Sequence, residues 1–515
     1  MQLARVIETS EAVAATRSRT AKTAALARTL REAHGTGLEE VVADYLAGVL
    51  PQRRVGVSWR GLRSLPEPAE TSTLTVAEVH EELTAMAGIG GAGSTAERAE
   101  AVRRLFSRAT AKEQSWLVGL ITGELRQGAS DGVLQKAIAE AAEVPEAAVR
   151  RAVMLAGFAG PVAAAALSGG EDALREIRLE VGRPLRPMLA ASAPDVDTAL
   201  AGADGEVALE SKLDGIRLQA HLDRSAGPGG DVRLFTRTLE DVTDRMPEVV
   251  EAVLGLPART AVLDGEVIVE EHGRPAPFQV TGSRTMSRTD PGRLREEAPL
   301  TTYLFDVLHL DGQDLVDVPS GERWQALADL APAHLVPRLV TADVREARDF
   351  FAERVGAGHE GVVVKSLSAP YAAGRRGAGW VKVKPRHTLD LVVLAVEWGS
   401  GRRQGWLSNI HLGARDAETG ELVMLGKTFK GMTDEMLEWQ TRRFTELKES
   451  DDGWVVRVRP EQVVEIAFDG VQRSRRYPGG VALRFARVLR YRDDKPVEEI
   501  DTLQTVKALS GFVER

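Results

Sequence analysis

ESKLDGIRLQ, residues 210–219, is the stretch that decides the fold. The β-branched and apolar residues before it predict a β-strand, in which successive side chains point to opposite faces. Glu210 and Lys212 therefore share one face, and Asp214-Gly215 predicts a turn where the strand ends. Such a lysine is either an ordinary partner of the carboxylate or a nucleophile, which must lose its proton and so have a pKa well below about 10.4.

More lysines follow with the same alternation. WVKVKP at 380–385 puts Trp380, Lys382 and Lys384 on one strand face, an arrangement that favours contact with anionic groups. Lys365 ends a further strand-like run, EGVVVK at 360–365. With Lys212, these residues supply four lysines for a phosphate.

Two carboxylates accompany the lysines. In VLDGEVIV at 262–269, Glu266 points away from the face of Leu263 and Val267, and Glu360 stands where EGVVVK begins. Taken singly, each is more typical of a solvated charge than of a ligand. Together with the lysines they predict a phosphoryl-transfer site with a divalent cation, because that chemistry asks mainly for positioning and charge stabilisation.

Composition limits the other possibilities. The 515 residues suggest about three domains, and 43% hydrophobic with 27% charged residues is typical of a globular protein. No apolar run reaches the roughly 20 residues of a membrane helix, and the first residues do not resemble a secretory signal, so we expect a cytoplasmic protein with no membrane contact. The absence of cysteine excludes disulfides and thiolate zinc sites, and the nine histidines form no metal-binding pair.

The sequence pattern predicts a multidomain chain of three parts. Residues 1–175 have the three- and four-residue apolar spacing of an all-α domain. Residues 185–386 alternate short β-branched runs with helical segments, which predicts an α+β domain. Residues 387–515 hold several short strands and one helix at 433–447, which fits a small OB-type β-barrel.

A glycine-rich stretch, GIGGAGST at 88–95, has the spacing of a phosphate-binding loop. Ser94 occupies the position where such a loop needs lysine, and a helical segment rather than a strand precedes it. We interpret it as a turn.

Seven segments in fixed order resemble the covalent nucleotidyltransferases, and among them the ATP-dependent DNA ligases. The helical region around LITGELRQGASDGVLQKAIAEA at 120–141 is similar, more loosely, to the DNA-binding domain of the larger ligases. The seven segments are KLDGIR (212–217), TRTLEDVT (236–243), LDGEVIV (263–269), YLFDVLHLDG (303–312), EGVVVKS (360–366), WVKVKP (380–385) and RVLRYRDDK (487–495).

The resemblance implies a role for each matching position. Lys212 would carry AMP in a phosphoramidate bond, Glu210 would accept a hydrogen bond from the adenine amino group, and Phe305 would stack on the base. The other implied contacts are Arg217 and Arg237 to ribose, phosphate or nick; Glu266 to a ribose hydroxyl or metal; Glu360 to metal; Arg376, Lys382 and Lys384 to the α-phosphate; and Arg492 and Lys495 to the leaving pyrophosphate.

Three positions depart from the family pattern or leave it ambiguous. Thr236-Arg237-Thr238 replaces the usual Ser-Arg-Asn, and Ala486 stands where proline is common. Arg375 is placed as well as Arg376 for the phosphate.

The resemblance implies a ligase that seals 5′-phosphate/3′-hydroxyl nicks in duplex DNA, with ATP as co-substrate and Mg²⁺, or Mn²⁺, as metal. It would act as a monomer, associated with the nucleoid when on DNA; the pattern leaves its protein partners and its pathway open.

Three alternatives remain to be weighed. An RNA ligase or GTP-using capping enzyme is disfavoured by the large helical amino-terminal region. Glu210 also disfavours use of GTP, because guanine offers an oxygen acceptor at the same edge. NAD-dependent ligases typically carry a four-cysteine zinc module, which this chain lacks. An inert DNA-binding scaffold would have lost Lys212 or the lysine pair, and all three lysines are present.

Overall fold

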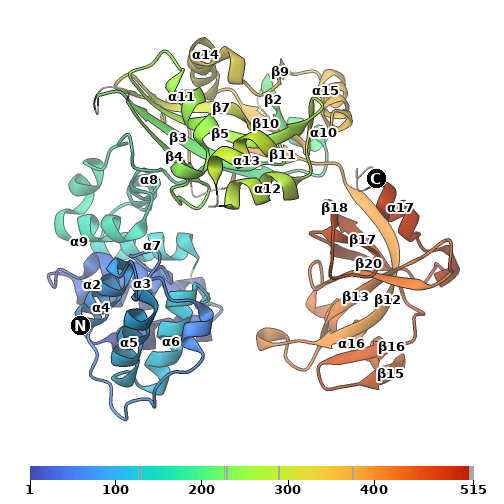
Figure 1. Ribbon diagram of the computed structural model, residues 1–515, viewed down its shortest axis with the longest axis horizontal. Helices are drawn as coiled ribbons and strands as arrows, with labels where there is room; N and C mark the ends of the chain where they lie inside the picture. The colour runs from blue at the N-terminus through green and yellow to red at the C-terminus, as the bar shows by residue number, and fades with distance from the viewer. Residues whose placement is uncertain are drawn as a thin grey trace.

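The computed structural model describes residues 1–509 except 126, 129, 204, 226, 228–229, 288–289 and 374–375. The chain forms three lobes arranged in a C, with the middle lobe joining a helical lobe to a mostly β C-terminal lobe (Figure 1). Among the described residues, no helix is both long and apolar enough to cross a bilayer.

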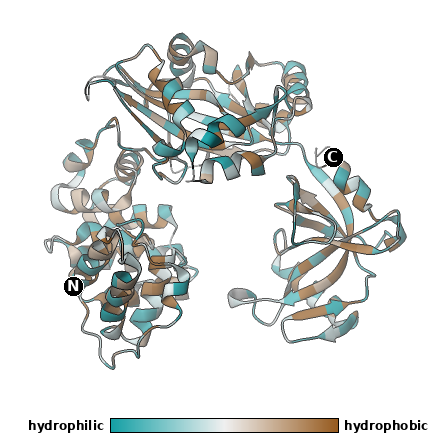
Figure 2. Ribbon diagram, viewed as in Figure 1, coloured by the Kyte–Doolittle hydropathy of each residue, from teal (hydrophilic) through white to brown (hydrophobic). Residues whose placement is uncertain are grey.

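The helical lobe confirms the predicted all-α amino-terminal region. Its helices alternate apolar and polar positions (Figure 2), and the apolar sides meet in one core. Capping boxes at Thr75/Glu78 and Thr110/Glu113 fix where two of the helices begin. The helices are α1 (Leu3–Ala15), α2 (Arg19–Ala33), α3 (Glu39–Ala47), α4 (Val76–Gly88), α5 (Ser94–Ser107), α6 (Ala111–Thr122), α7 (Asp131–Ala142), α8 (Glu146–Ala156) and α9 (Ala159–Arg175), which is kinked at Gly170.

The middle lobe contains two sheets. The first is antiparallel, with strand order β4-β3-β5-β7-β8 and β6 paired to β5; the second has the order β1-β11-β10-β2-β9. The elements are β1 (Leu189–Ser192), α10 (Val196–Ala201), β2 (Val207–Lys212), β3 (Ile216–Asp223), β4 (Asp231–Thr236), α11 (Pro247–Leu254), β5 (Thr260–Glu271), β6 (Arg274–Pro275), α12 (Phe278–Met286), α13 (Pro291–Glu297), β7 (Leu300–Leu310), β8 (Gln313–Asp314), α14 (Ser320–Leu330), β9 (Arg338–Thr341), α15 (Val344–Gly356), β10 (Gly361–Ser366) and β11 (Arg376–Val383).

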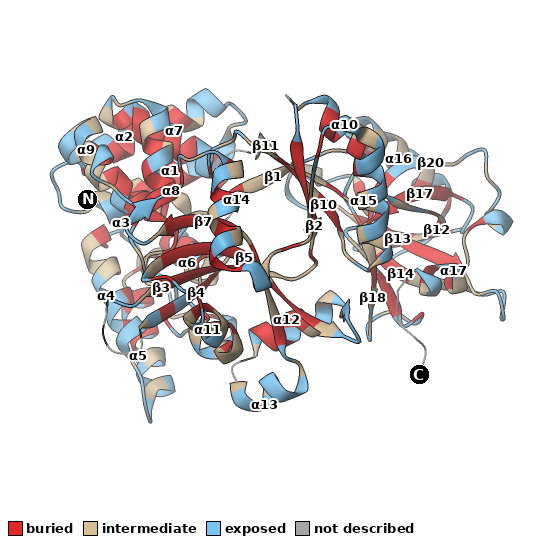
Figure 3. Ribbon diagram, turned by 90° about the horizontal axis from the view of Figure 1, so that it is seen from above, coloured by how far each residue is buried: buried red, intermediate tan, exposed pale blue. Residues whose placement is uncertain are grey.

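Helices cover one face of the second sheet and leave the other face to a cavity. Leu209 and Val207 of β2 pack with β10, β11, α10 and α15 in one apolar cluster. The alternating residues, Glu210 and Lys212, consequently face the first sheet. The central strands of the first sheet, β3, β5 and β7, are mostly buried, whereas α13 lies exposed on the surface (Figure 3).

The C-terminal lobe is mostly β, as predicted, around its own core. Its large sheet has the order β14-β13-β12-β16-β15, with β17 pairing to β12 and β20, and β18 pairs separately with β19. The elements are β12 (His387–Trp398), β13 (Leu407–Arg415), β14 (Leu422–Thr428), α16 (Asp434–Glu446), β15 (Lys448–Asp451), β16 (Val455–Val458), β17 (Val463–Phe468), β18 (Gly470–Arg473), β19 (Val481–Arg484), β20 (Arg487–Tyr491) and α17 (Leu503–Ala508).

Two details of this lobe differ from the sequence prediction. The β-rich run ALRFARVLRY at 482–491, which by pattern alone reads as one strand, is divided into β19 and β20 at Phe485, whose φ of 54° cannot continue a strand. A second helix, α17, follows the predicted helix α16; at six residues it is too short for its apolar period to stand out.

Candidate active site

A cavity of about 710 Å³ opens between the two middle sheets. Residues of β2, β10 and β11 form one side of the cavity, residues of β3, β5 and β7 form the other, and Asp469, Arg484 and Phe485 reach it from the C-terminal lobe. The predicted residues that line it are Glu210, Lys212, Arg217, Arg237, Glu266, Phe305, Glu360, Lys365, Lys382 and Lys384.

Strand register explains why residues so far apart in sequence meet here. Lys212 lies opposite Gly361 and Glu210 opposite Val363, while Val363 in turn lies opposite Lys382 on β11. Residues directly opposite in adjacent strands point to the same face. Gly361 has a φ of 140°, and a β-carbon there would lie 2.1 Å from the Val383 carbonyl oxygen, so the close approach of β10 and β11 requires glycine.

Lys212 shares a carboxylate with Lys384. The Nζ atoms of the two lysines pair with the two carboxylate oxygens of Glu360, and Lys384 also pairs with Asp469 at 3.0 Å. Burial alone would raise the pKa of Glu360, but the two ammonium groups outweigh it and hold this pKa below its usual range. Glu360 is therefore an ionised group beside the lysine predicted to react.

Glu266 holds the turn that follows Lys212. Its Oε1 accepts a hydrogen bond of 2.9 Å from the Gly215 amide, and a β-carbon at Gly215 would lie 2.3 Å from the Val267 carbonyl oxygen. Burial raises the pKa of Glu266 to about 7, although the nearby Lys212 ammonium opposes the rise. The Asp-Gly turn is thus required by the contact between this turn and β5.

An aromatic wall lies at the other end of the cavity. The rings of Phe305 and Trp380 meet edge to face, 5.9 Å apart. The Lys365 ammonium lies 4.8 Å and 4.4 Å from these two ring centroids and donates to the Phe305 carbonyl oxygen at 2.9 Å. The same ammonium pairs with Glu210 at 2.5 Å, so Lys365 links Glu210 to the aromatic wall of Phe305 and Trp380.

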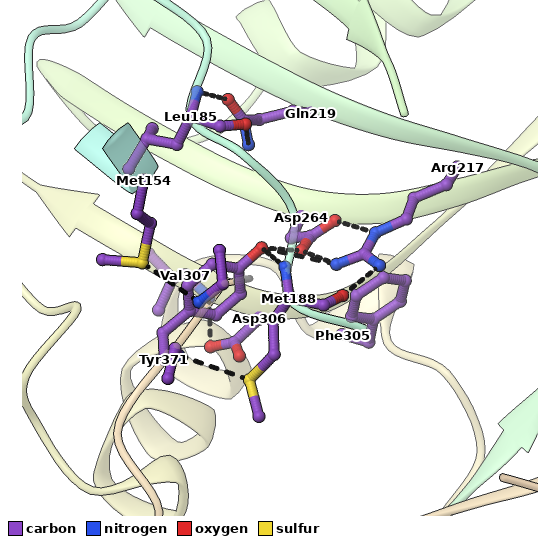
Figure 4. A network of polar contacts seen from close by, with 12 residues as sticks. Met154, Leu185, Met188, Arg217, Gln219, Asp264, Phe305, Asp306, Val307 and Tyr371 are labelled. Carbon is purple, nitrogen blue, oxygen red and sulfur yellow. Dashed lines mark hydrogen bonds and ion pairs between the residues drawn. The ribbon is translucent and has the colours of Figure 1, made fainter. Parts of the chain in front are cut away.

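Arg217 is engaged in a buried network (Figure 4). Its guanidinium donates to both carboxylate oxygens of Asp264, at 2.9 Å and 2.6 Å, and to the Met188 carbonyl oxygen at 2.6 Å. The Tyr371 hydroxyl donates to Asp264 at 2.8 Å and accepts from the Met188 amide at 3.0 Å. Sequence reasoning missed Asp264 and Tyr371. Of the two, only Asp264 could have been found, because strand alternation places it on the same face as Glu266.

Two predicted residues are not among the described residues that line the cavity, and the side chain of a third is not described. Arg492 and Lys495 bind Asp390 in the C-terminal lobe, at 3.1 Å and 2.8 Å. Arg376 begins β11, but its side chain lies outside the described residues, and so does Arg375 altogether.

The C-terminal lobe contributes residues that the sequence motifs did not single out. Arg484 pairs with Asp214 at 2.6 Å, two residues beyond Lys212, and its guanidinium lies 4.9 Å from the Phe278 ring centroid. Lys384–Asp469 is a second ion pair between these lobes. In the sequence, Arg484 is marked only by its place in residues 473–495, which carry eight Lys/Arg and two Asp.

The arrangement of these side chains indicates which kind of chemistry the cavity can perform. A lysine that ends a strand, bordered by an ionised carboxylate and further ammonium groups in a cavity with an aromatic wall, suits covalent transfer of a nucleotide to the protein. Family models identify the particular group: "DNA ligase N terminus" matches residues 60–139, "ATP dependent DNA ligase domain" matches 187–384 and "ATP dependent DNA ligase C terminal region" matches 403–495. The chain belongs to the ATP-dependent DNA ligase family, whose general mechanism passes through an AMP-linked lysine.

Curated relatives agree over the whole length. The chain is 61% identical over 516 residues to a probable DNA ligase of Nocardioides sp. strain JS614, covering 99% of each chain. It is 58% identical over 521 residues to a probable DNA ligase of Beutenbergia cavernae, covering 99% of this chain and all of the relative. A solved structure titled Pmar-Lig_PreS3 is 18% identical, with a TM-score of 0.63 and 95% and 99% coverage, and shows the shared fold.

Proposed function

We propose that this ligase seals 5′-phosphate/3′-hydroxyl nicks in duplex DNA, with Lys212 as the nucleophile. The observation that carries the proposal is the position of Lys212 in the cavity, against Glu360 and beside Lys382 and Lys384. In the first step the Lys212 Nζ forms a bond to the α-phosphorus of ATP, loses a proton, and displaces pyrophosphate. AMP then passes to the 5′-phosphate of the nick. In the last step the 3′-hydroxyl attacks that phosphate and AMP leaves.

The remaining cavity residues divide between the phosphate and the base. We propose that Lys382, Lys384 and Arg376 hold the α-phosphate as charge builds on it. Glu210 would accept from the adenine amino group, and Phe305 would stack on the ring. Arg217 and Arg237 would contact the ribose, a phosphate or the nick.

Glu360 and Glu266 fit a magnesium ion held partly by substrate. Among the described residues, no group of three or more His, Cys, Asp or Glu side chains is placed to bind a metal. Two carboxylates facing a site for phosphates are the usual protein share of a magnesium site, whose other ligands are phosphate oxygens and water. The ion would neutralise charge on the phosphates, and Lys212 and Lys384 would then exchange Glu360 for phosphate.

We propose that parts 1–175, 185–386 and 387–515 act as separate domains, the last with an OB-type fold. Arg492 and Lys495 are bound to Asp390, outside the cavity. To reach the pyrophosphate, they would have to move toward ATP by a rotation of the whole C-terminal domain. In this structure the Arg484–Asp214 pair holds that domain in another orientation. Since one chain supplies every proposed contact, we expect a monomer that works in the cytoplasm, on nucleoid DNA.

Incubation with α-labelled ATP and Mg²⁺, followed by a chase, tests this function. We expect an acid-labile label on the protein that nicked duplex DNA discharges, with recovery of sealed DNA. The control is an intact duplex of the same sequence, which should leave the label in place. Labelling from GTP, or discharge by nicked RNA alone, would instead support the RNA-directed alternative.

Binding to nicked DNA should depend strongly on salt. Arg237 lines the ATP cavity and also a second cavity of about 840 Å³, which Arg53 and Arg54 of the helical lobe share. Each phosphate contact releases counterions, so even two contacts weaken binding about tenfold between 50 and 200 mM salt. Fluorescence anisotropy with labelled nicked duplex measures this. An affinity that does not change with salt would contradict binding through the DNA backbone.

A further inference from the structure

Glu210 is held by two cations, one on each carboxylate oxygen. Lys365 on β10 pairs with Oε2 at 2.5 Å, and Arg338 donates from Nη1 to Oε1 at 3.3 Å. Arg338 begins β9 and lies directly opposite Glu210 in the register of β2 with β9. Unlike Lys365, it lies outside the seven segments that resemble the ligases, and it is not among the residues that line the cavity.

Arg338 is a buried arginine with few polar contacts. Its side chain is only 8% exposed, and its guanidinium lies 4.1 Å from the centroid of the Trp324 ring on α14. Within the described part of the chain, Glu210 is its only ion-pair partner, and its buried Nε has no hydrogen-bond partner. A buried guanidinium with an unsatisfied donor costs stability, and the contacts that offset this cost are the Glu210 pair and the Trp324 ring.

Through Glu210, Arg338 acts on the part of the cavity that is proposed to bind adenine. Trp324 fixes the plane of the guanidinium, because a stacked arginine loses rotational freedom. The guanidinium in turn donates a hydrogen bond to Glu210 Oε1, while the Lys365 ammonium pairs with Oε2, so both oxygens are held in place. Each carboxylate oxygen has about two acceptor positions, so one on each oxygen stays available to a ligand.

We infer that Arg338 is a positioning residue for base selection, which aims the Glu210 carboxylate at the 6-amino group of the purine. The inference rests on the proposed role of Glu210. Without Arg338, Oε1 has no cation, and the carboxylate is free to turn toward Lys365. The hydrogen bond to the amino group then loses its direction, although Lys212 and the phosphate contacts are untouched.

Charge supports the same arrangement. Burial raises the pKa of Glu210, and the Lys365 ammonium and the Arg338 guanidinium oppose the rise. A protonated Glu210 would donate as well as accept, and would no longer repel the 6-oxo group of guanine. Arg338 therefore favours the form of Glu210 that accepts only.

The test compares self-adenylylation with ATP and with purine riboside 5′-triphosphate, which lacks the 6-amino group, by the mass increase of the intact protein. In Arg338→Met we expect the KM for ATP to rise about tenfold, the loss of one charge-assisted hydrogen bond, with kcat within about twofold. The KM for the analogue should hardly change, because it has no amino group for Glu210 to bind. The preference for ATP should therefore shrink about tenfold.

Arg284→Met is the matched control. Arg284 is also buried and paired with a glutamate, Glu248 at 2.7 Å, but does not touch Glu210. It should lower thermal stability and leave the preference for ATP unchanged. Arg338→Lys keeps a charge without the fork geometry, so its preference for ATP should lie between those of the wild type and Arg338→Met. If the methionine variant does not fold, a reduced preference in Arg338→Lys is the expected result.

The outcomes separate the two levels of the argument. A wild-type protein that gains no AMP would contradict the proposed function itself. A wild-type protein that gains AMP and prefers ATP, together with Arg338 variants that keep this preference in full, would overturn only the role of Arg338. Equal losses with ATP and the analogue would also overturn it, because they would reveal a general defect of the fold.

Discussion

Lys212→Met protein gains no AMP under conditions that label the wild type completely. Methionine keeps the length and most of the apolar contacts of lysine but has no nitrogen to attack phosphorus. No other group replaces a covalent nucleophile, so the rate of self-adenylylation should fall at least about 10⁴-fold. Intact-protein mass spectrometry after incubation with ATP and Mg²⁺ measures the mass increase directly.

Two controls make this result specific. Lys427→Met removes another partly buried lysine paired with a glutamate, Glu397, in the C-terminal lobe, and should be labelled like the wild type. Lys212→Met should still seal a nick whose 5′-phosphate already carries AMP, because the last step uses the 3′-hydroxyl as nucleophile. AMP uptake by Lys212→Met would place the nucleophile elsewhere, and failure on the pre-adenylated nick would show that the site is disrupted.

Asp264→Asn should be the most destabilising of the conservative changes around the site. Asp264 is 1% exposed and is the carboxylate partner of Arg217, whose side chain is 16% exposed. An amide leaves the guanidinium without its counter-charge, and breaking a buried pair in this way costs about 3–5 kcal/mol. Urea unfolding followed by tryptophan fluorescence should show an earlier first transition, with a lower melting temperature.

A matched pair of variants separates charge from shape. Asp197→Asn removes a carboxylate from the exposed pair with Arg348 in the same lobe and should leave unfolding almost unchanged. Adding Arg217→Met to Asp264→Asn removes the unpaired cation and should restore part of the lost stability. If the double variant were as unstable as the sum of two single losses, the network of Asp264, Arg217 and Tyr371 would not act as an ion pair.

Much of the cavity could be predicted because strands alternate. Once residues 207–212 and 380–384 are strands, Lys212, Glu210, Lys382 and Lys384 must each lie on the face opposite Leu209, Val381 and Val383. The same rule does not say which strands are neighbours. That β10 lies between β2 and β11, and so brings Glu360 between Lys212 and Lys384, depends on contacts between distant parts of the chain.

Residues outside the motifs were beyond prediction for the same reason. Tyr371 stands in an irregular segment and reaches Asp264, more than a hundred residues away, only through folding. Arg484 belongs to a different lobe and meets Asp214 because of how the lobes are oriented. Arg492 and Lys495 match their motif well, yet in this lobe orientation they lie away from the cavity and pair with Asp390 of their own lobe.

The amino-acid sequence by itself determined the family, the helical and β-rich regions and the residue types of the site, because periodicity and ordered motifs are local properties of the chain. Tertiary structure decided the partners: Glu360 for Lys212, Asp264 for Arg217, and Arg338 with Lys365 for Glu210. A charge becomes a ligand, a structural pair or a positioning residue only through its neighbours and its burial, and these come from strand order and lobe orientation.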